Sequence, residues 1–180
     1  AVVSDHGEGL GDHGEDTHGM FLYEGTLRVA FVLSLSGLFR GGTHVTDRAV
    51  SLVDLRPTLE DLLGIPPGGV PFDGMSLLSP GAATDRPLYI ETMMPFHLLR
   101  CSPLAGIRRL ADKYIETPIP EYYDLREDPR ELTNLSESRP AEREELVAAL
   151  AGMRKGWTAE AGAAAREMSA EEAERLRSLG

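Results

Sequence analysis

Three of the five histidines of this chain fall within a glycine-rich stretch near its N-terminus, between residues 6 and 18. The stretch follows a short β-branched run at Val2 and Val3, so Asp5 and His6 stand at the end of a predicted strand. A carboxylate oxygen and an imidazole nitrogen side by side are ligands for a divalent cation. The glycines that follow let the backbone fold tightly around a bound group. The pattern therefore predicts a metal-assisted hydrolase.

Two other interpretations of this stretch stay open at this point. His6, His13 and His18 could form a self-contained zinc site, although their spacings of seven and five residues match no common zinc signature. Alternatively, the histidines and acidic residues lie on a solvated turn and face water. A calcium-binding loop is excluded, because Gly7 and Gly9 stand where such a loop, counted from Asp5, needs oxygen ligands.

Composition limits the class of protein. The 180 residues suffice for one domain core or one lobe of a larger domain, and the net charge of −11 argues against a nucleic-acid partner. Cys101 is the single cysteine, so no internal disulfide is expected. The longest apolar run, residues 29–33, is too short for a membrane helix, so we expect a soluble protein. The chain opens on Ala1 without a basic leader, so we expect it to continue a longer protein whose location stays unknown.

The order of predicted elements favours an α/β fold for residues 1–85. Residues 1–4 have the pattern of a strand end, and residues 28–35 that of a central strand covered on both faces, because they are nearly all apolar. A helix is predicted over residues 51–63, where Pro57 is tolerated only near the first turn. A surface loop rich in glycine and proline completes this region.

Residues 86–153 predict a small antiparallel subdomain followed by a helix, because its short strands follow one another without crossover helices. The strands are expected at residues 87–92, 105–110, 113–116 and 122–125, and the helix at residues 141–153.

Residues 154–180 predict a linker followed by a C-terminal helix. The linker is expected to reach residue 168. A capping box of Ser169 and Glu172 then predicts a helix over residues 169–179.

Several short motifs follow one another along residues 1 to about 150. They include Ser4-Asp5-His6-Gly7-Glu8, Asp73-Gly74-Met75-Ser76-Leu77 and Asp128-Pro129-Arg130-Glu131-Leu132, and others lie within residues 23–29, 50–64, 113–115 and 122–125. In this order they resemble the C-terminal part of the sulfatase family, a branch of the alkaline-phosphatase superfamily. The resemblance implies the C-terminal part of an alkaline-phosphatase-like α/β sandwich, with a small antiparallel sheet and C-terminal helices.

The resemblance also implies a cofactor and ligands for it. Asp5 and His6 match the family's Asp-Asn or Asp-His pair that holds the active-site divalent cation. Calcium is the ion most typical of the family, and manganese or magnesium are alternatives, since imidazole suits manganese better than calcium. The other ligands, and the Cys or Ser nucleophile that becomes formylglycine, lie upstream in the family and outside these residues. Cys101 lacks the family's surrounding motif and is not that nucleophile.

Two further histidines are candidate substrate contacts. Many family members carry Lys thirteen residues after the metal-binding Asp, and His18 stands at that position here. We therefore expect His18 to contact substrate or protonate the leaving group. His13 is a second candidate for substrate binding, although it more often shapes such a loop. Residues 124–134 contain several acidic and amide side chains, which we expect to cap turns rather than bind metal.

The expected function is hydrolysis of sulfuric esters, assisted by a divalent cation. The substrate would be a small-molecule or glycan sulfate ester, and the N-terminal remainder of the same domain would complete the site. A phosphonate or phosphate ester hydrolase, or a phosphoryl-group transferase, of the same superfamily is the alternative. A non-catalytic scaffold lobe is the third hypothesis, against which the intact Asp5 and His6 count.

Overall fold

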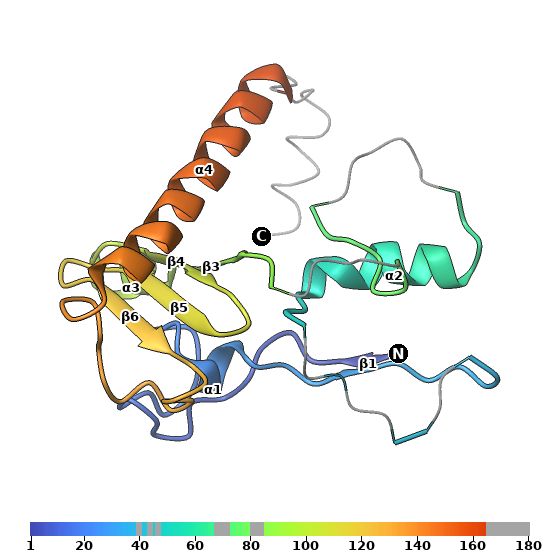
Figure 1. The fold of residues 1–180 in the computed structure, drawn as a ribbon, viewed down its shortest axis with the longest axis horizontal. Helices are drawn as coiled ribbons and strands as arrows, with labels where there is room; N and C mark the ends of the chain where they lie inside the picture. The colour runs from blue at the N-terminus through green and yellow to red at the C-terminus, as the bar shows by residue number, and fades with distance from the viewer. Residues whose placement is uncertain (39–40, 43–44, 46–47, 67–72, 80–84, 165–180) are drawn as a thin grey trace, which may run out of the picture.

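The computed structural model describes residues 1–38, 41–42, 45, 48–66, 73–79 and 85–164, with side chains up to residue 157. Two antiparallel sheets organise these residues, a two-stranded sheet near the N-terminus and a four-stranded sheet (Figure 1). Their combination with helices agrees with the predicted α/β class. Within the described part of the chain, no helix combines the length and the apolar character that crossing a membrane requires.

The four-stranded sheet has the strand order β3-β4-β5-β6 and confirms the predicted antiparallel subdomain. Its strands are β3 (Leu88–Thr92), β4 (Leu104–Arg108), β5 (Asp112–Glu116) and β6 (Glu121–Asp124). A short helix that the sequence did not indicate, α3 (Met94–Leu99), lies between β3 and β4. Pro95 stands in its first turn, where a missing N–H costs nothing, and Arg100 ends it in the left-handed conformation.

Helix α4 (Pro140–Ala164) covers one face of this sheet and forms the main core with it (Figure 1). Leu146 and Leu150 lie one helical turn apart and pack against inward-facing side chains of the strands, which are Ile107, Tyr114 and Tyr122. The predicted helix is thus confirmed, but it continues past Met153, so residues 154–164 are helical rather than a linker. The predicted helix over residues 169–179 lies outside the described residues.

The opposite face of the sheet is covered by the segment that leads out of the histidine-rich stretch. Leu22 packs there against Ile115 and Tyr123 in a second core cluster. The short helix α1 (Glu24–Leu27) follows directly and adds Leu27 to the same cluster. The segment that follows the histidine-rich stretch is therefore anchored on this face of the sheet by apolar packing.

The two-stranded sheet pairs β1 (Val2–Val3) with β2 (Phe31–Val32), and Val2 lies opposite Val32. The predicted strand over residues 28–35 is therefore reduced to two residues, and Val32 is 54% exposed. The expectation of a central strand covered on both faces is wrong for the described residues. A strand extends only where a neighbour accepts its backbone hydrogen bonds, and β1 is the one described strand paired with it.

The predicted helix near residue 51 is present as a 3₁₀ turn, η1 (Leu52–Asp54), that continues into α2 (Leu55–Leu62). Pro57 lies in the first turn of α2, as expected. Ser51 and Asp54 cap the start reciprocally, and the fully buried Asp54 carboxylate also pairs with Arg86.

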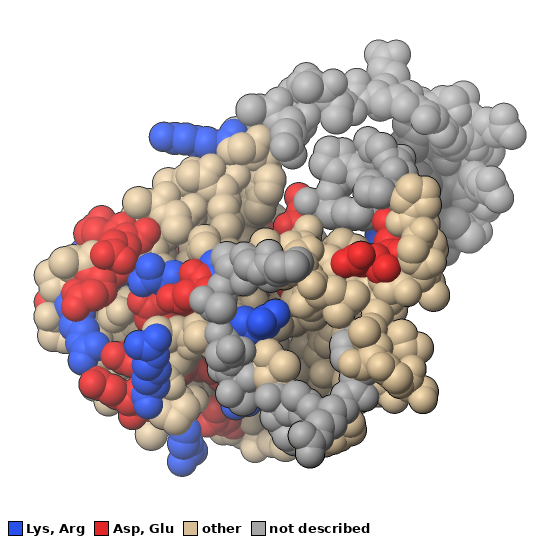
Figure 2. Space-filling view, turned by 45° about the vertical axis from the view of Figure 1, so that its right-hand side comes forward, with Lys and Arg blue, Asp and Glu red and all other residues tan. Residues whose placement is uncertain are grey.

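Acidic and basic side chains are interspersed on the face seen in Figure 2. Ion pairs among the described residues include Arg139 with Asp124 at 2.7 Å and with Glu127 at 2.8 Å. Such alternation is typical of a solvated surface.

Candidate active site

The histidine-rich stretch is held in place by backbone hydrogen bonds between segments. The Gly7 N–H donates to the Thr26 carbonyl at 2.8 Å, and the Gly9 N–H donates to the Thr17 carbonyl at 2.6 Å. A Cβ atom at Gly7 would lie 2.3 Å from the Gly25 carbonyl oxygen. Only glycine allows so close an approach of two backbones. This close packing of Gly7 on Gly25 fixes the backbone of the loop that carries Asp5 and His6.

Asp5 and His6 follow the end of β1, as predicted. The His6 Nδ1 atom lies 2.7 Å from the Gly7 carbonyl oxygen, which can only accept, so this nitrogen carries the proton. The Nε2 atom is then free to bind a cation, and it lies 3.7 Å from Asp5 Oδ1. A carbonyl that orients the ring of a metal-binding histidine is typical of metal sites. The donor pair therefore fits a divalent cation, and the 89% exposed Asp5 carboxylate leaves room for further ligands.

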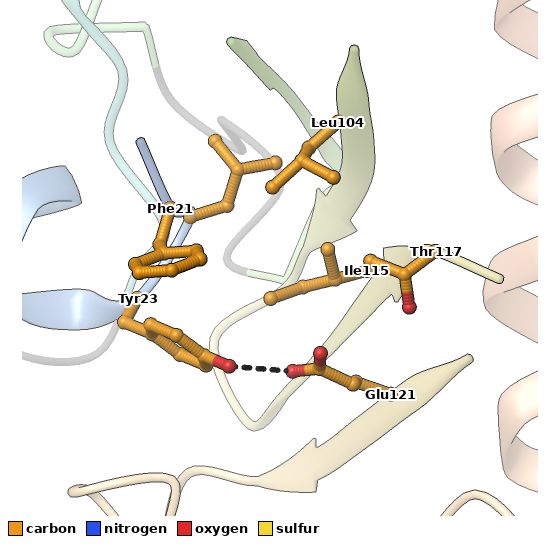
Figure 3. A pocket seen from close by; sticks show the side chains of 7 residues that line it. Phe21, Tyr23, Leu104, Ile115, Thr117 and Glu121 are labelled. Carbon is orange, nitrogen blue, oxygen red and sulfur yellow. Dashed lines mark hydrogen bonds between the residues drawn. The ribbon is translucent and has the colours of Figure 1, made fainter. Parts of the chain in front are cut away.

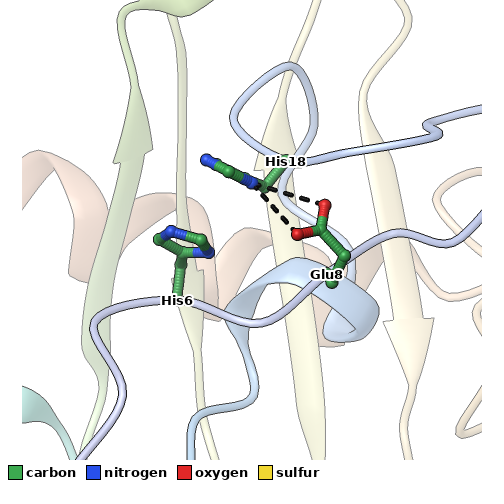
Figure 4. Close-up of side chains that lie close together, drawn as sticks. All are labelled: His6, Glu8 and His18. Carbon is green, nitrogen blue, oxygen red and sulfur yellow. Dashed lines mark hydrogen bonds and ion pairs between the residues drawn. The ribbon is translucent and has the colours of Figure 1, made fainter.

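The structure brings His18 directly to His6. The two imidazole rings stack with their centroids 3.7 Å apart and their planes 24° apart. The carboxylate of Glu8 lies beside His18, with its oxygens 3.3 and 3.4 Å from His18 Nδ1 (Figure 4). Residues twelve positions apart thus share one small surface, which the sequence alone did not reveal.

His13 takes a different place from the other two. Its Nε2 atom lies 3.0 Å from the carbonyl oxygen of Glu131, and its ring stacks on Tyr23 at a centroid distance of 3.7 Å. The residue has a positive φ of 50°, which fits a tight turn. The structure therefore does not join His13 to His6 and His18, and a direct contact of His13 with substrate stays a prediction.

A buried ionic cluster lies beneath this loop and was missed by sequence reasoning. The Lys113 ammonium group donates to the Leu22 carbonyl at 2.9 Å, and it lies 3.2 Å from Glu24 and 2.5 Å from Glu131. Arg108 forms a further ion pair with Glu24 at 3.1 Å. A lysine next to the tyrosine and isoleucine of a predicted strand was the available signal, because a buried charge needs partners.

The cluster affects its two carboxyl groups in opposite directions. Burial raises the pKa of Glu24, but Lys113 and Arg108 outweigh burial and lower that pKa below its usual value. Burial dominates at Glu131 and raises its pKa, although Lys113 acts against it. The Glu131 carboxylate also accepts a hydrogen bond from the Glu24 N–H at 2.7 Å, so it ties the loop to the turn after β6.

Asp124, Asp128 and Asn134 cap turns, as expected, whereas Glu131 joins the buried ionic cluster instead. Asp124 accepts backbone N–H groups of Arg126 and Glu127, and Asp128 accepts the Thr133 N–H at 2.8 Å. Asn134 accepts the Tyr122 N–H at 3.1 Å. Their oxygens are engaged in these bonds rather than directed at a common point.

A small pocket of about 110 Å³ lies between the loop and the sheet, and Phe21, Leu104 and Ile115 line it (Figure 3). Its carboxylate, Glu121, accepts hydrogen bonds from the hydroxyls of Tyr23 at 3.0 Å and Tyr123 at 2.8 Å. Burial, with the nearby Glu121 charge, raises the pKa of Tyr23 to about 12. The polar groups are thus paired with one another, and the pocket is mainly apolar.

Comparison with known proteins identifies the family. No family model matches the chain. The choline-sulfatase of Rhizobium meliloti is 37% identical over 141 residues, which cover 75% of this chain and 26% of that protein. The chain belongs to the sulfatase family. It spans about a quarter of the length of this relative.

Solved structures agree with this membership at the level of the fold. The phosphonate monoester hydrolase of Agrobacterium radiobacter matches with a TM-score of 0.62 at 26% identity, over 86% of this chain and 34% of that chain. A protein solved with its substrate D-glucosamine-2-N,6-O-disulfate matches with a TM-score of 0.66 at 24% identity, over 87% of this chain and 34% of that chain. This sulfatase chain therefore has the fold of the C-terminal part of an alkaline-phosphatase-like protein.

Proposed function

We propose that this chain contributes part of the active site of a sulfuric ester hydrolase that uses a divalent cation. The observation that carries the proposal is the Asp5–His6 pair, in which the Gly7 carbonyl leaves His6 Nε2 free beside the Asp5 carboxylate. The relationship to a choline-sulfatase supports the reaction class. The nucleophile and the remaining ligands would lie in a part of the protein outside these 180 residues.

Each residue has a distinct role in this proposal. Asp5 and His6 hold the cation, which withdraws charge from the ester oxygens when it is bound. His18 contacts the sulfate group or gives a proton to the leaving oxygen, since its ring lies against His6 and its Nδ1 is engaged by Glu8. Calcium is our first candidate for the cation, with manganese or magnesium as alternatives.

The proposed substrate is a sulfate ester of a small molecule or a glycan. One structural neighbour has a sulfated glucosamine as its substrate, and one relative is a choline-sulfatase. The exposed position of Asp5 and His18 suits a substrate that approaches from solvent.

The test uses the full-length protein that contains this chain and 4-nitrophenyl sulfate as substrate. We expect hydrolysis that a chelator abolishes and a divalent cation restores. Asp5→Asn, His6→Ala and His18→Ala should each lower kcat/KM by about 100-fold or more. His97→Ala, which changes an exposed histidine on α3, is the matched control and should keep full activity. Full activity in the Asp5 and His6 variants would refute the proposal.

A phosphonate or phosphate ester hydrolase is the second candidate, favoured by the phosphonate monoester hydrolase among the structural neighbours. Comparing kcat/KM for 4-nitrophenyl sulfate and for a 4-nitrophenyl phosphonate ester decides between the two. A higher value for the phosphonate ester would select this candidate, and turnover of neither ester would favour a non-catalytic scaffold.

A further inference from the structure

Three metal-binding side chains meet on the surface of the histidine-rich loop. One ligand atom from each of His6, Glu8 and His18 lies within 4.8 Å of the others, and Figure 4 shows the three side chains close together. Asp5, which we place at the hydrolytic cation, is not among them.

Backbone contacts hold the segments of these residues close to one another. Glu8 precedes Gly9 and His18 follows Thr17, and the hydrogen bond of 2.6 Å between Gly9 N and Thr17 O aligns the two segments. A Cβ atom at Gly9 would lie 2.3 Å from the Glu15 carbonyl oxygen, so the segments are packed as closely as glycine allows. Glu8 and His18 are therefore positioned in advance, which lowers the entropy cost of binding.

Their chemistry suits a transition metal ion. Two imidazoles and one carboxylate form a ligand set that proteins use for zinc. Zinc–ligand bonds of roughly 2.0–2.1 Å in a tetrahedron place the ligand atoms about 3.4 Å apart. His18 Nδ1 and Glu8 Oε1 already lie 3.3 Å apart, so an ion could replace the proton between them.

The side chains also have room to complete the site. Their exposed fractions are 42% for His6, 43% for Glu8 and 41% for His18. The stacked rings need a rotation of the His6 side chain to direct a nitrogen at the ion, and this degree of exposure permits it. Solvent reaches all three residues, so an ion can enter and a water molecule can fill the fourth position.

We propose that His6, Glu8 and His18 bind a transition metal ion, with Zn²⁺ as the probe, at a site that differs from the hydrolytic cation site in its other ligands. The two sites share His6, so they cannot be filled together. Binding itself does not depend on the proposed function. One consequence does rest on it, namely that Zn²⁺ inhibits ester hydrolysis by removing His6 and His18 from the reaction.

The test is isothermal titration of Zn²⁺ into the chelator-treated full-length protein. We expect one zinc ion to bind. Glu8→Gln and His18→Ala should each weaken the zinc affinity by about 100-fold, which is the upper end of the loss typical for mutations around a metal site. Asp5→Asn and the control His97→Ala should keep the wild-type affinity. In NMR spectra, zinc should shift the imidazole signals of His6 and His18 and leave those of His13 unchanged, since His13 lies elsewhere.

Three results would overturn the inference. The first is that the protein binds no zinc. The second is that Glu8→Gln and His18→Ala leave the zinc affinity unchanged. The third is that Asp5→Asn lowers the zinc affinity as much as Glu8→Gln does. Failure of the proposed function is visible separately. A protein that binds zinc, but hydrolyses no ester when it is assayed without zinc and with calcium, manganese or magnesium, would refute that function and leave the zinc site standing.

Discussion

At the residue scale, Lys113 connects the N-terminal loop with the four-stranded sheet. Its side chain is 0% exposed, and its ammonium group reaches the Leu22 carbonyl from the second position of β5. The same group neutralises Glu24 of α1 and Glu131 of the turn that follows β6. A single buried charge thereby connects the loop of the candidate site to the sheet beneath it.

Replacing Lys113 with Met should be strongly destabilising. The variant leaves two buried carboxylates without their shared cation, and losing one partner of a buried pair costs about 3–5 kcal/mol. Urea unfolding of the full-length protein measures this loss. Arg126→Met, at an exposed position, is the control and should change stability little. A Lys113→Met variant as stable as the control would show that the buried ion pair is not needed.

At the scale of elements, Asp124 connects β6 with the residues before α4. Its carboxylate accepts two backbone N–H groups of the following turn and pairs with Arg139 at 2.7 Å. Burial raises its pKa, but the hydrogen bonds from Arg139 and from the backbone outweigh burial and lower the pKa below the ordinary value of 3.8.

This shift predicts a pH-dependent stability. A carboxyl group with a lowered folded-state pKa contributes stability that is complete above its unfolded value and is lost as the pH falls through the folded value. The unfolding free energies of wild type and Asp124→Asn should therefore differ most at neutral pH and converge below pH 3.8. Unfolding by urea across this range tests the claim, which a constant difference would contradict.

Gly74 shows why the Asp73–Leu77 motif requires glycine. A Cβ atom at Gly74 would lie 2.0 Å from the Val53 carbonyl oxygen, at the point where this loop packs on η1. Gly74→Ala should cost about 1–3 kcal/mol, because backbone must move to make room. Gly152→Ala on α4 meets nothing within 4 Å and should instead gain about 0.5–1 kcal/mol. Equal effects of the two changes in thermal unfolding would contradict this explanation.

At the scale of the whole molecule, the described structure supports a site without completing it. The four-stranded sheet is covered by α4 on one face and by the loop and α1 on the other. The Asp5–His6 pair stands at the end of the short β1 strand, where Asp5 is open to solvent. In the proposed function, the described residues would supply two candidate ligands and one candidate proton donor.

The 180-residue chain should therefore not hydrolyse 4-nitrophenyl sulfate by itself. Two ligands do not replace the water around a divalent ion well, so we also expect the hydrolytic cation to bind weakly to this chain. An assay with added calcium, manganese or magnesium tests both expectations, with the full-length protein as positive control. Metal-dependent turnover by the 180 residues alone would show that no essential group lies outside them.

Local sequence was sufficient for features that neighbouring residues decide. The four strands of the larger sheet could be predicted because short β-branched and aromatic runs alternate with turn residues. The helix predicted over residues 51–63, with Pro57 near its first turn, is present, and the capping role of Asp124 and Asn134 followed from their side-chain chemistry. The Asp5–His6 pair was visible for the same reason, because its two members are adjacent.

Tertiary structure decided which distant groups share a site. His13 bonds to a carbonyl 118 residues away, and Lys113 reaches a carbonyl 91 residues away, so neither partner is visible in a local pattern. His18 joins His6 and Glu8 because backbone segments meet at Gly9 and Thr17. The sequence by itself determined the family and the candidate ligands. The packing of the loop on the sheet decided their grouping, because close backbone contacts and buried charges bring the segments of His6 and His18 together and hold His13 apart from them.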